Sequence, residues 1–279
     1  MKDNSKPRSI LITGASSGIG LCAAQSLRHR GYQVIAAVRK REDMARLEQE
    51  GIEAVQLDLA NSASIRTAVD KALERTQGRL YALFNNGAYG QPGAVEDLSR
   101  EMLREQFEVN LFGTHELTRC IIPIMRAQGY GRIIQTSSVL GLVALKFRGA
   151  YSATKFALEG LSDTLRMELA GTGIQVILIE PGPILSRFRE NSYAAYKRYI
   201  DWENSPHRAT YEAIERRLQT KGAVVPFTLP PEAVVKSLVQ ALESSRPKLR
   251  YYVTLPTYLF AFLKRALPAR LLDRILSRI

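Results

Sequence analysis

Two side chains suited to proton transfer lie four residues apart near the middle of the sequence. Tyr151 and Lys155 both fall in a helical pattern that runs from Arg148 to Gly171, so we expect them on one face of a helix. A tyrosine phenol has a pKa of about 10 in water, and a neighbouring cation lowers that pKa by favouring the phenolate. The pair therefore predicts acid/base chemistry.

The spacing alone does not identify a site, because Tyr193 and Lys197 repeat it. The context of the two pairs differs. A β-rich run, Arg132–Thr136, delivers a serine, Ser138, 13 residues before Tyr151, whereas no serine stands at that distance before Tyr193. We interpret the second pair as the polar face of a helix in the substrate loop.

A glycine-rich turn opens the chain. The apolar run Ser9–Thr13 predicts a buried strand, the sequence Gly14–Gly20 has the spacing G-x-x-x-G-x-G, and a helical pattern follows over Leu21–Arg30. A strand, a glycine-rich turn and a helix together point free backbone N–H groups and the positive end of a helix dipole toward phosphate. This arrangement predicts a dinucleotide site.

The residues after the second predicted strand indicate which dinucleotide binds. The strand Gln33–Val38 is followed by Arg39, at a point where an acid usually holds a free ribose hydroxyl. A guanidinium group suits a 2′-phosphate instead. We therefore expect NADP(H) rather than NAD(H). The alternative is a solvated basic turn before the helical pattern Glu42–Glu50.

Strands and helices alternate at short spacing along the chain. Further strands are predicted at Glu53–Leu57, Leu80–Phe84, Arg132–Thr136, Ile174–Ile179 and Arg250–Thr254. This pattern predicts an α/β fold, with a doubly wound parallel sheet of about seven strands and helices on both faces. Ligands of such sheets bind beyond the carboxyl ends of the strands. Asp58 with Leu59, and Asn86 with Gly87, follow the third and fourth strands there.

Composition bounds the remaining functions. The 279 residues are 46% hydrophobic and show neither a linker nor a repeat, so we expect one domain. Two distant cysteines, Cys22 and Cys120, argue against disulfides and for a reducing compartment. The three histidines have no metal-ligand spacing, so no metal is expected. A short polar N-terminus, Met1–Ser9, favours a cytoplasmic protein without a signal peptide.

Positive charge gathers at the C-terminus. The formal net charge is +12, and the segment Arg246–Ile279 holds eight Lys or Arg and one Asp, or +7. No recognition motif for nucleic acid accompanies it, so nucleic-acid binding is not expected. In Leu271–Ile279 the apolar side chains share one helical face and the arginines another. This basic amphipathic helix could lie on an anionic membrane, on its own protein or on a second subunit.

Taken in order, these motifs resemble the short-chain dehydrogenase/reductase family. The series consists of Thr13-Gly14-x3-Gly18-x-Gly20, Asn85-Asn86-Gly87-Ala88, Asn110, Ser138, Tyr151-x3-Lys155 and Pro181-Gly182. Within the family, the chain resembles NADP(H)-preferring members of the aldehyde reductase, 17-beta-hydroxysteroid dehydrogenase and retinol dehydrogenase kinds. The resemblance covers about residues 8–186 closely. It implies a Rossmann-type fold and a homo-oligomer, a dimer or a tetramer.

The resemblance also implies a role for each matching residue. Tyr151 would be the general acid/base, Ser138 would hydrogen-bond the substrate oxygen, and Lys155 would lower the pKa of Tyr151 and bind the nicotinamide ribose. Asn110 would hold a water of a proton relay. The expected cofactor-binding residues are Gly14, Ser16, Ser17, Gly18, Ile19, Gly20, Arg39, Asp58, Leu59, Asn86, Gly87, Tyr151, Lys155, Pro181, Gly182, Ile184 and Ser186.

Two departures from the family pattern stand out. The family usually reads Asn-Asn-Ala-Gly, but Gly87 and Ala88 are exchanged here, which puts the local backbone angles in question. Ser186 stands where the family often has threonine, and either hydroxyl could contact the carboxamide or the phosphate.

The predicted activity is hydride transfer between NADP(H) and a lipophilic carbonyl or alcohol, with reduction as the expected direction. Residues 1–186 would form the cofactor-binding and catalytic core, 187–230 a substrate lid, and 246–279 the C-terminal extension. The aromatic residues of the lid segment would form either core faces of two amphipathic helices or an apolar wall of the pocket. The alternative function is a cofactor-binding scaffold or redox sensor without turnover.

Overall fold

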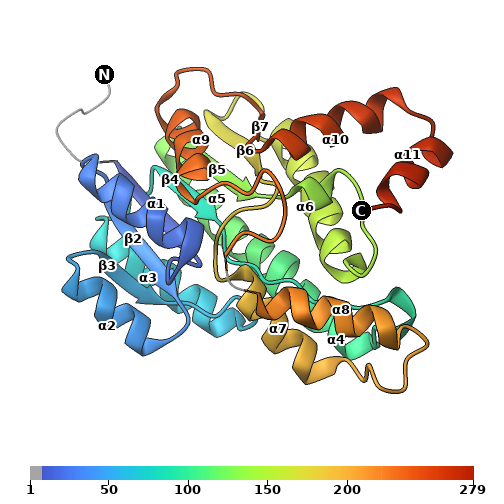
Figure 1. Ribbon diagram of the computed structural model, residues 1–279. Helices are drawn as coiled ribbons and strands as arrows, with labels where there is room; N and C mark the ends of the chain where they lie inside the picture. The colour runs from blue at the N-terminus through green and yellow to red at the C-terminus, as the bar shows by residue number, and fades with distance from the viewer. Residues whose placement is uncertain (1–7, 221) are drawn as a thin grey trace.

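The computed structural model describes residues 8–220 and 222–279. The predicted polar N-terminus, residues 1–7, lies outside them. The described residues form seven strands in one parallel sheet of order β3-β2-β1-β4-β5-β6-β7 (Figure 1). The strands are β1 Ser9–Thr13, β2 Gln33–Val38, β3 Glu53–Gln56, β4 Ala82–Asn85, β5 Gly131–Thr136, β6 Ile174–Glu180 and β7 Arg250–Tyr252.

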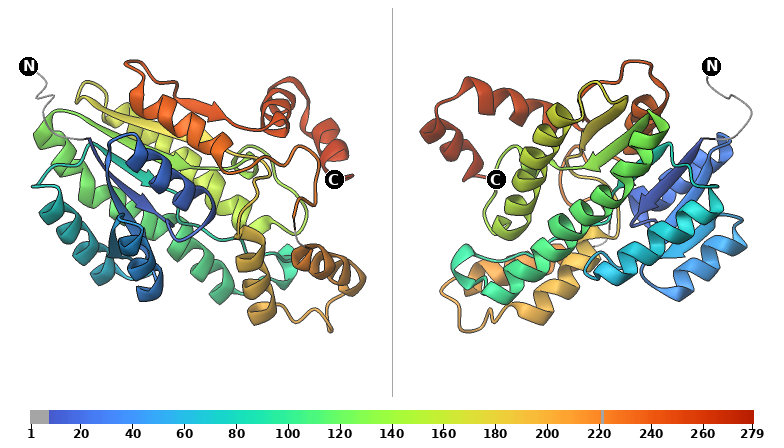
Figure 2. Two further views of the ribbon diagram at one scale, coloured as in Figure 1. Left: turned by 60° about the vertical axis from the view of Figure 1, so that its left-hand side comes forward. Right: turned by 180° about the vertical axis from the view of Figure 1, so that it is seen from behind.

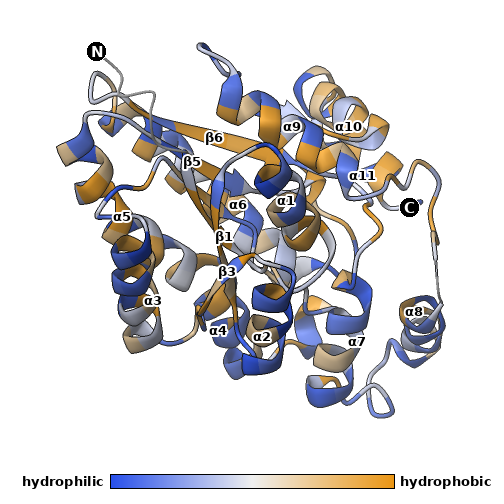
Figure 3. Cartoon of the chain, turned by 90° about the vertical axis from the view of Figure 1, so that its left-hand side faces the viewer, coloured by the Kyte–Doolittle hydropathy of each residue, from blue (hydrophilic) through white to orange (hydrophobic). Residues whose placement is uncertain are grey.

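Helices cover both faces of the sheet, which confirms the predicted α/β fold. One face packs on α1 (Gly18–His29), α2 (Arg41–Gln49) and α9 (Glu232–Glu243). The other packs on α3 (Ser62–Arg75), α5 (Thr114–Gln128) and α6 (Gly149–Glu168), and the two layers are visible in the turned views (Figure 2). The central parts of the strands are mostly apolar, as expected where both faces of a sheet are covered (Figure 3).

The long helical pattern predicted over Glu101–Met125 is divided. Helix α4 (Arg100–Phe107) passes into a π-helical segment, η2 (Glu108–Gly113), and then into α5. Asn110 lies in this π segment and is buried. The polar interruption noted in the sequence therefore coincides with a change of helical type, as is common near functional sites.

Two single-turn helices and two longer helices complete the part beside the carboxyl ends of the strands. Two single-turn helices, η1 (Val95–Asp97) and η3 (Val139–Gly141), precede α4 and α6. Helices α7 (Phe188–Tyr199) and α8 (Arg208–Gln219) form the predicted lid segment. Most of its aromatic residues pack together in a small core of their own, around Tyr196 and Tyr211.

The chain ends in two helices, α10 (Leu255–Ala266) and α11 (Ala269–Leu276), which lie together beside α6. Thr257 and Ala261 are buried, whereas Tyr258, Leu259 and Phe262 are exposed. Helix α10 thus turns its small residues inward and its large apolar residues outward. None of the described helices is both long and apolar enough to cross a membrane.

Candidate active site

The glycine-rich turn connects β1 to α1 in a tightly packed conformation. Gly14 and Gly18 have φ values of +65° and +53°, a region that side chains disfavour. A Cβ on Gly20 would lie 2.2 Å from the carbonyl oxygen of Gly14. The first turn of α1 therefore rests directly on the loop, with its N-terminal N–H groups at the carboxyl edge of the sheet, where an anion can bind.

Predicted cofactor residues from two other loops meet this turn. A Cβ on Gly18 would lie 2.9 Å from the Cβ of Ser186, and one on Gly14 would lie 2.9 Å from the Cα of Gly87. Backbone N–H groups of Asn86 and Gly87 donate to the hydroxyl of Thr13, at 2.9 and 2.8 Å. The cradle is thus built from β1, β4 and the loop after β6.

The exchange of Gly87 and Ala88 is accommodated without backbone strain. Neither residue has a positive φ, so the fourth motif position here does not require glycine. A Cβ on Gly87 would lie 3.1 Å from a methyl carbon of Leu59 and 3.2 Å from the Thr13 hydroxyl. Glycine at position 87 instead gives the loops room to approach each other.

Asp58 and Leu59 lie at the end of β3, as predicted. The carboxylate of Asp58 accepts from the backbone of Ala60 at 3.0 Å. A Cβ on Gly113 would lie only 1.8 Å from the carbonyl oxygen of Leu59, so the π segment touches this loop. Sequence reasoning missed Gly113, because its importance comes from a contact between distant segments.

Arg39 is exposed at the end of β2, and its side chain forms no ion pair with another described residue. Its backbone carbonyl accepts from the amide of Gln56 at 3.1 Å. A second cation was missed by sequence reasoning: Arg46 donates to the carbonyl of Ser16 at 2.7 Å. This bond ties α2 to the glycine-rich turn, and Arg46 also pairs with Asp43 of the same helix.

Ser138, Tyr151 and Lys155 meet where β5 ends and α6 begins. The Ser138 hydroxyl acts on the Tyr151 phenol, whose pKa it lowers, and it accepts from the N–H of Leu140 at 3.1 Å. The Nζ of Lys155 is buried, donates to the carbonyl of Thr136 at 2.7 Å, and lies 5.6 Å from the centre of the Tyr151 ring. The chain therefore brings together the three groups that the sequence singled out.

The expected lowering of the tyrosine pKa is not found in this structure. Burial raises the pKa of Tyr151 to about 12, and the neighbouring Ser138 side chain only partly offsets this. Burial also lowers the pKa of Lys155 to about 8, against the opposing charge of Glu159. The reason is that desolvation disfavours both the phenolate and the ammonium. The ammonium is also directed to the Thr136 carbonyl, so it does little to lower the pKa of the phenol.

Asn110 is held by hydrogen bonds to protein groups. Its side-chain oxygen accepts from the N–H of Tyr89 at 3.1 Å, and its nitrogen donates to the Tyr89 carbonyl at 2.8 Å and to Thr154 at 3.3 Å. The side chain therefore fixes the loop after β4 against η2 and α6. Its predicted role as a water ligand stays a prediction.

The loop Pro181–Ser186 closes the site from the side of β6. The carbonyl of Pro181 accepts from the N–H of Val139 at 2.8 Å. A Cβ on Gly182 would lie 2.1 Å from the Thr254 hydroxyl, so the start of α10 presses against this loop. Ile184 pairs with Leu229 in an isolated bridge, which links the loop to the segment before α9.

The second tyrosine–lysine pair lies in the lid segment. Tyr193 donates to Glu215 at 3.0 Å, and Lys197 lies 3.6 Å from the same carboxylate. Both therefore join α7 to α8, as expected of a helix face. Phe188 of the same helix packs its ring against that of Tyr151, with centroids 5.3 Å apart. The lid segment thus has core aromatics and also one aromatic at the site.

Comparison with known proteins identifies the family. A family model described as short chain dehydrogenase matches residues 8–197. The chain belongs to the short-chain dehydrogenase family. The fold agrees with this assignment. The chain matches a solved short-chain dehydrogenase/reductase of Burkholderia phymatum in complex with NAD, with a TM-score of 0.78 and 26% identity over 97% of this chain and 95% of that one.

Relatives of this short-chain dehydrogenase span almost its whole length. The oxidoreductase YbbO of Escherichia coli K12 is 43% identical, over 97% of this chain and 94% of YbbO. The NADPH-dependent 3-dehydrocapnine reductase of Ornithobacterium rhinotracheale is 31% identical, over 96% and 95%. Human retinol dehydrogenase 8 is 32% identical, over 88% and 80%. The chain is therefore an oxidoreductase of the short-chain dehydrogenase type that uses a nicotinamide cofactor.

Other potential chemistry in this dehydrogenase is limited. Cys22 and Cys120 are free, and burial raises the pKa of Cys22 to about 11 and also raises that of Cys120. Neither thiol is thus activated as a thiolate. Within the described part of the chain, no three histidine, cysteine or acidic side chains gather where they could hold a metal ion.

Proposed function

We propose that the protein is an NADP(H)-dependent reductase of lipophilic carbonyl compounds, with Tyr151 as the general acid. The observation that carries this proposal is the meeting of Ser138, Tyr151 and Lys155 beside the glycine cradle. The cradle fits a pyrophosphate, because side chains are excluded at Gly14, Gly18 and Gly20. When bound there, NADP(H) supplies the hydride.

Three residues of the site would supply a proton to the substrate oxygen and stabilise the negative charge that develops on it. The hydroxyls of Ser138 and Tyr151 are the donors that would meet this oxygen. Since the pKa of Tyr151 is about 12, the phenol holds its proton at neutral pH, which is the form that carbonyl reduction requires. The buried ammonium of Lys155 would then stabilise the phenolate that remains after proton transfer.

The cofactor preference rests on Arg39. Its exposed guanidinium, unpaired with any described acid, follows β2, where a cation would meet the ribose 2′-phosphate of NADP(H). One relative is by name NADPH-dependent, although a solved relative binds NAD. We therefore take NADP(H) as the cofactor.

The substitution Arg39→Asp tests the cofactor preference. We expect NADPH affinity to fall about 30-fold and NADH affinity to change little, because a charge-assisted hydrogen bond contributes about 1.5–3 kcal/mol. Fluorescence titration with each nucleotide measures both values. Arg119→Asp, an equal charge change at an exposed position of α5, is the control. An equal loss for NADPH and NADH, or none, would contradict the preference.

An apolar substrate is supported by the side chains at the site. Phe188 lies against Tyr151, and Leu185 of the loop after β6 is 40% exposed. Two relatives are by name a 3-dehydrocapnine reductase and a retinol dehydrogenase. A lipid-like, retinoid-like or steroid-like carbonyl, or an aldehyde, is the proposed substrate class.

The alternative, a cofactor-binding scaffold or redox sensor, has less support. A redox sensor that works through cysteine needs an accessible, activated thiol, and the pKa of both cysteines is raised. A scaffold needs no donors beside the nicotinamide. The deciding experiment follows NADPH absorbance with aldehydes and ketones of rising chain length. Turnover that increases with chain length supports the reductase, and binding of NADPH without turnover on any of them supports the scaffold.

The C-terminal helices support a peripheral membrane location. The exposed apolar residues of α10 lie near Lys264 and Arg265, α11 carries Arg270 and Arg274, and Arg278 lies two residues beyond the end of α11. Large apolar side chains beside cations match an anionic bilayer surface. The start of α10 also packs against the loop Pro181–Ser186. Contact of α10 with a membrane would therefore bring a membrane-dissolved substrate close to the site. We propose a cytoplasmic protein that binds membranes at this surface.

The substitution Phe262→Glu tests this contact. Phe262 is 66% exposed, and losing its insertion into lipid should lower partitioning to vesicles that contain phosphatidylglycerol by roughly tenfold or more. Met167→Glu is the matched control, since Met167 is equally exposed on α6. Sedimentation with vesicles measures the bound fraction. Equal partitioning of the variant and the wild type would refute the membrane contact.

Two further predictions rest on the family resemblance. They are the division into a core of residues 1–186, a lid of residues 187–230 and an extension of residues 246–279, and assembly as a homo-dimer or homo-tetramer. Sedimentation analysis of the full chain would determine the assembly.

A further inference from the structure

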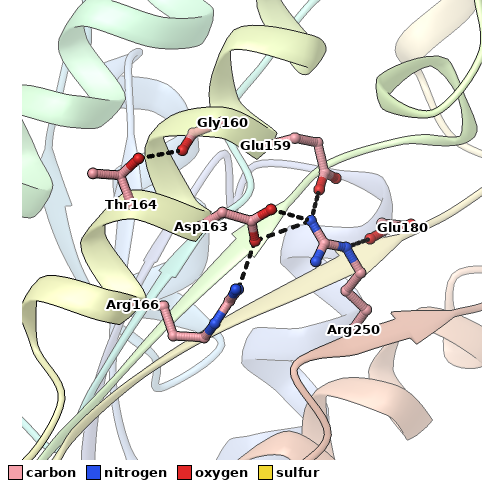
Figure 4. Close-up of polar contacts among 7 residues, drawn as sticks. All are labelled: Glu159, Gly160, Asp163, Thr164, Arg166, Glu180 and Arg250. Atoms are coloured by element: carbon pink, nitrogen blue, oxygen red, sulfur yellow. Dashed lines mark hydrogen bonds and ion pairs between the residues drawn. The ribbon is translucent and has the colours of Figure 1, made fainter.

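A cluster of charged side chains lies behind the catalytic helix (Figure 4). Arg250 of β7 lies at its centre, with Nη2 2.7 Å from Oε2 of Glu159 and 3.0 Å from Oδ2 of Asp163. Its Nε lies 3.0 Å from Oε1 of Glu180, as an ion pair without hydrogen-bond geometry. Arg166 pairs with Asp163 at 2.6 Å. One guanidinium thus joins three carboxylates from α6 and β6.

The members of the cluster differ in their exposure to solvent. The side chain of Asp163 is 37% exposed, that of Glu159 is 10% exposed, and that of Glu180 is fully buried. Oε1 of Glu159 is also buried and has no hydrogen-bond partner. A buried carboxylate with one unpartnered oxygen is costly. A role in holding the fold together would not require it, because Asp163 already binds the same guanidinium.

The Glu159 carboxylate lies one helical turn from the catalytic lysine. Glu159 follows Lys155 by four residues on α6, which places the two side chains on one face. Lys155 is buried, with Nζ fixed on the Thr136 carbonyl. Because the low-dielectric interior screens charges weakly, the charge of Glu159 acts on this ammonium directly.

Other charged groups face the pair from the neighbouring elements. On α6 these are Tyr151 and Asp163, on β7 Arg250, and on α10 Lys264, whose pKa burial lowers and Glu159 raises. On β6, burial first and then the charge of Glu159 raise the pKa of Glu180 to about 8. Glu159 is therefore the carboxylate nearest to Lys155 in sequence and on the helix face.

We infer that Glu159 is a positioning residue for the reaction: Arg250 holds its carboxylate one turn beyond Lys155, where its charge keeps the lysine ammonium protonated. This inference rests on the proposed function. Burial alone would favour neutral lysine, and neutral lysine could not stabilise the phenolate of Tyr151. Arg250, which the sequence marked only as the start of a strand, thereby links the last strand to the site.

Removing the negative charge of Glu159 should change the pKa of Lys155 in a defined direction. Glu159 favours the charged form of Lys155, so Glu159→Gln should lower the pKa of Lys155. Lys155 would then lose its proton at lower pH, and the reaction would lose its cation at lower pH as well. The alkaline limb of the pH profile should move down by about one pH unit, which corresponds to a tenfold change in proton affinity.

The direct test is the titration of Lys155 by nuclear magnetic resonance in the full-length protein with ¹⁵N-labelled lysine. The signal is assigned by its absence in Lys155→Arg. We expect the titration midpoint to fall by about one pH unit in Glu159→Gln. It should stay unchanged in Glu168→Gln, an identical substitution at an exposed position of the same helix, and stay near the wild-type value in Glu159→Asp. An unchanged midpoint in Glu159→Gln overturns the inference.

The second measurement is the pH profile of kcat/KM for NADPH-dependent reduction. We expect the alkaline limb of Glu159→Gln to follow the Lys155 titration, with Glu159→Asp restoring it. A uniform loss at every pH would mean a structural role only, and overturns the inference. If the wild type has no turnover on any carbonyl, the proposed function fails, while the titration still decides whether Glu159 controls the charge of Lys155.

Discussion

Replacing Tyr151 with phenylalanine is expected to lower kcat/KM for carbonyl reduction by about 1,000-fold, because a positioned general acid contributes about 10²–10⁴-fold. The change removes only the phenol hydroxyl, whose pKa the Ser138 side chain lowers. The ring remains to pack against Phe188, so NADPH affinity and the melting temperature should change little. Steady-state kinetics and fluorescence titration measure the two effects.

The chain supplies a matched control for this substitution. Tyr193 also precedes a lysine by four residues, but it donates to Glu215 in the lid segment. Tyr193→Phe should therefore keep most of the activity. Equal activity of Tyr151→Phe and the wild type would contradict the catalytic assignment, as would equal losses in both variants.

A methyl group at Gly20 is expected to weaken NADPH binding by about 100-fold. The added Cβ would lie 2.2 Å from the carbonyl oxygen of Gly14, so either the turn or the start of α1 must move. Overpacking of this kind costs about 1–3 kcal/mol, and here the displaced backbone is the one that would hold the phosphates. Titration of Gly20→Ala with NADPH measures the loss.

Gly160→Ala is the control for Gly20→Ala. Gly160 lies within α6, and a Cβ there would meet no atom within 4 Å. Alanine favours a helix over glycine by about 1 kcal/mol, so this variant should bind NADPH normally and be slightly more stable. Unchanged NADPH affinity in Gly20→Ala would mean that the turn does not hold the cofactor.

The fold could be predicted from the sequence because each strand is an apolar run followed by a helical pattern. The boundaries were less accurate where tertiary contacts decide them. The fourth strand begins at Ala82 rather than Leu80, since the backbone of Leu80 binds the side chain of Gln128 instead. The last strand ends at Tyr252 rather than Thr254, because Thr254 begins the cap of α10.

The candidate site was predictable in its residue types but not in its electrostatics. Spacing along one helix and two strand ends was enough to bring Tyr151, Lys155 and Ser138 together. The raised pKa of Tyr151 depends on burial, which no local pattern reveals. Arg46, Gly113 and Arg250 were missed for a similar reason, because each acts through a partner far away in the sequence.

The most direct test of the account is hydride transfer from NADPH that carries deuterium at C4 of the nicotinamide. The full-length protein is incubated with a long-chain aldehyde or ketone, using cofactor labelled on each face in turn, and the alcohol is analysed by mass spectrometry. The account predicts deuterium on the carbinol carbon for one of the two labels, and none of this product with Tyr151→Phe within the same time. No labelled alcohol from either cofactor, despite bound NADPH, would contradict it.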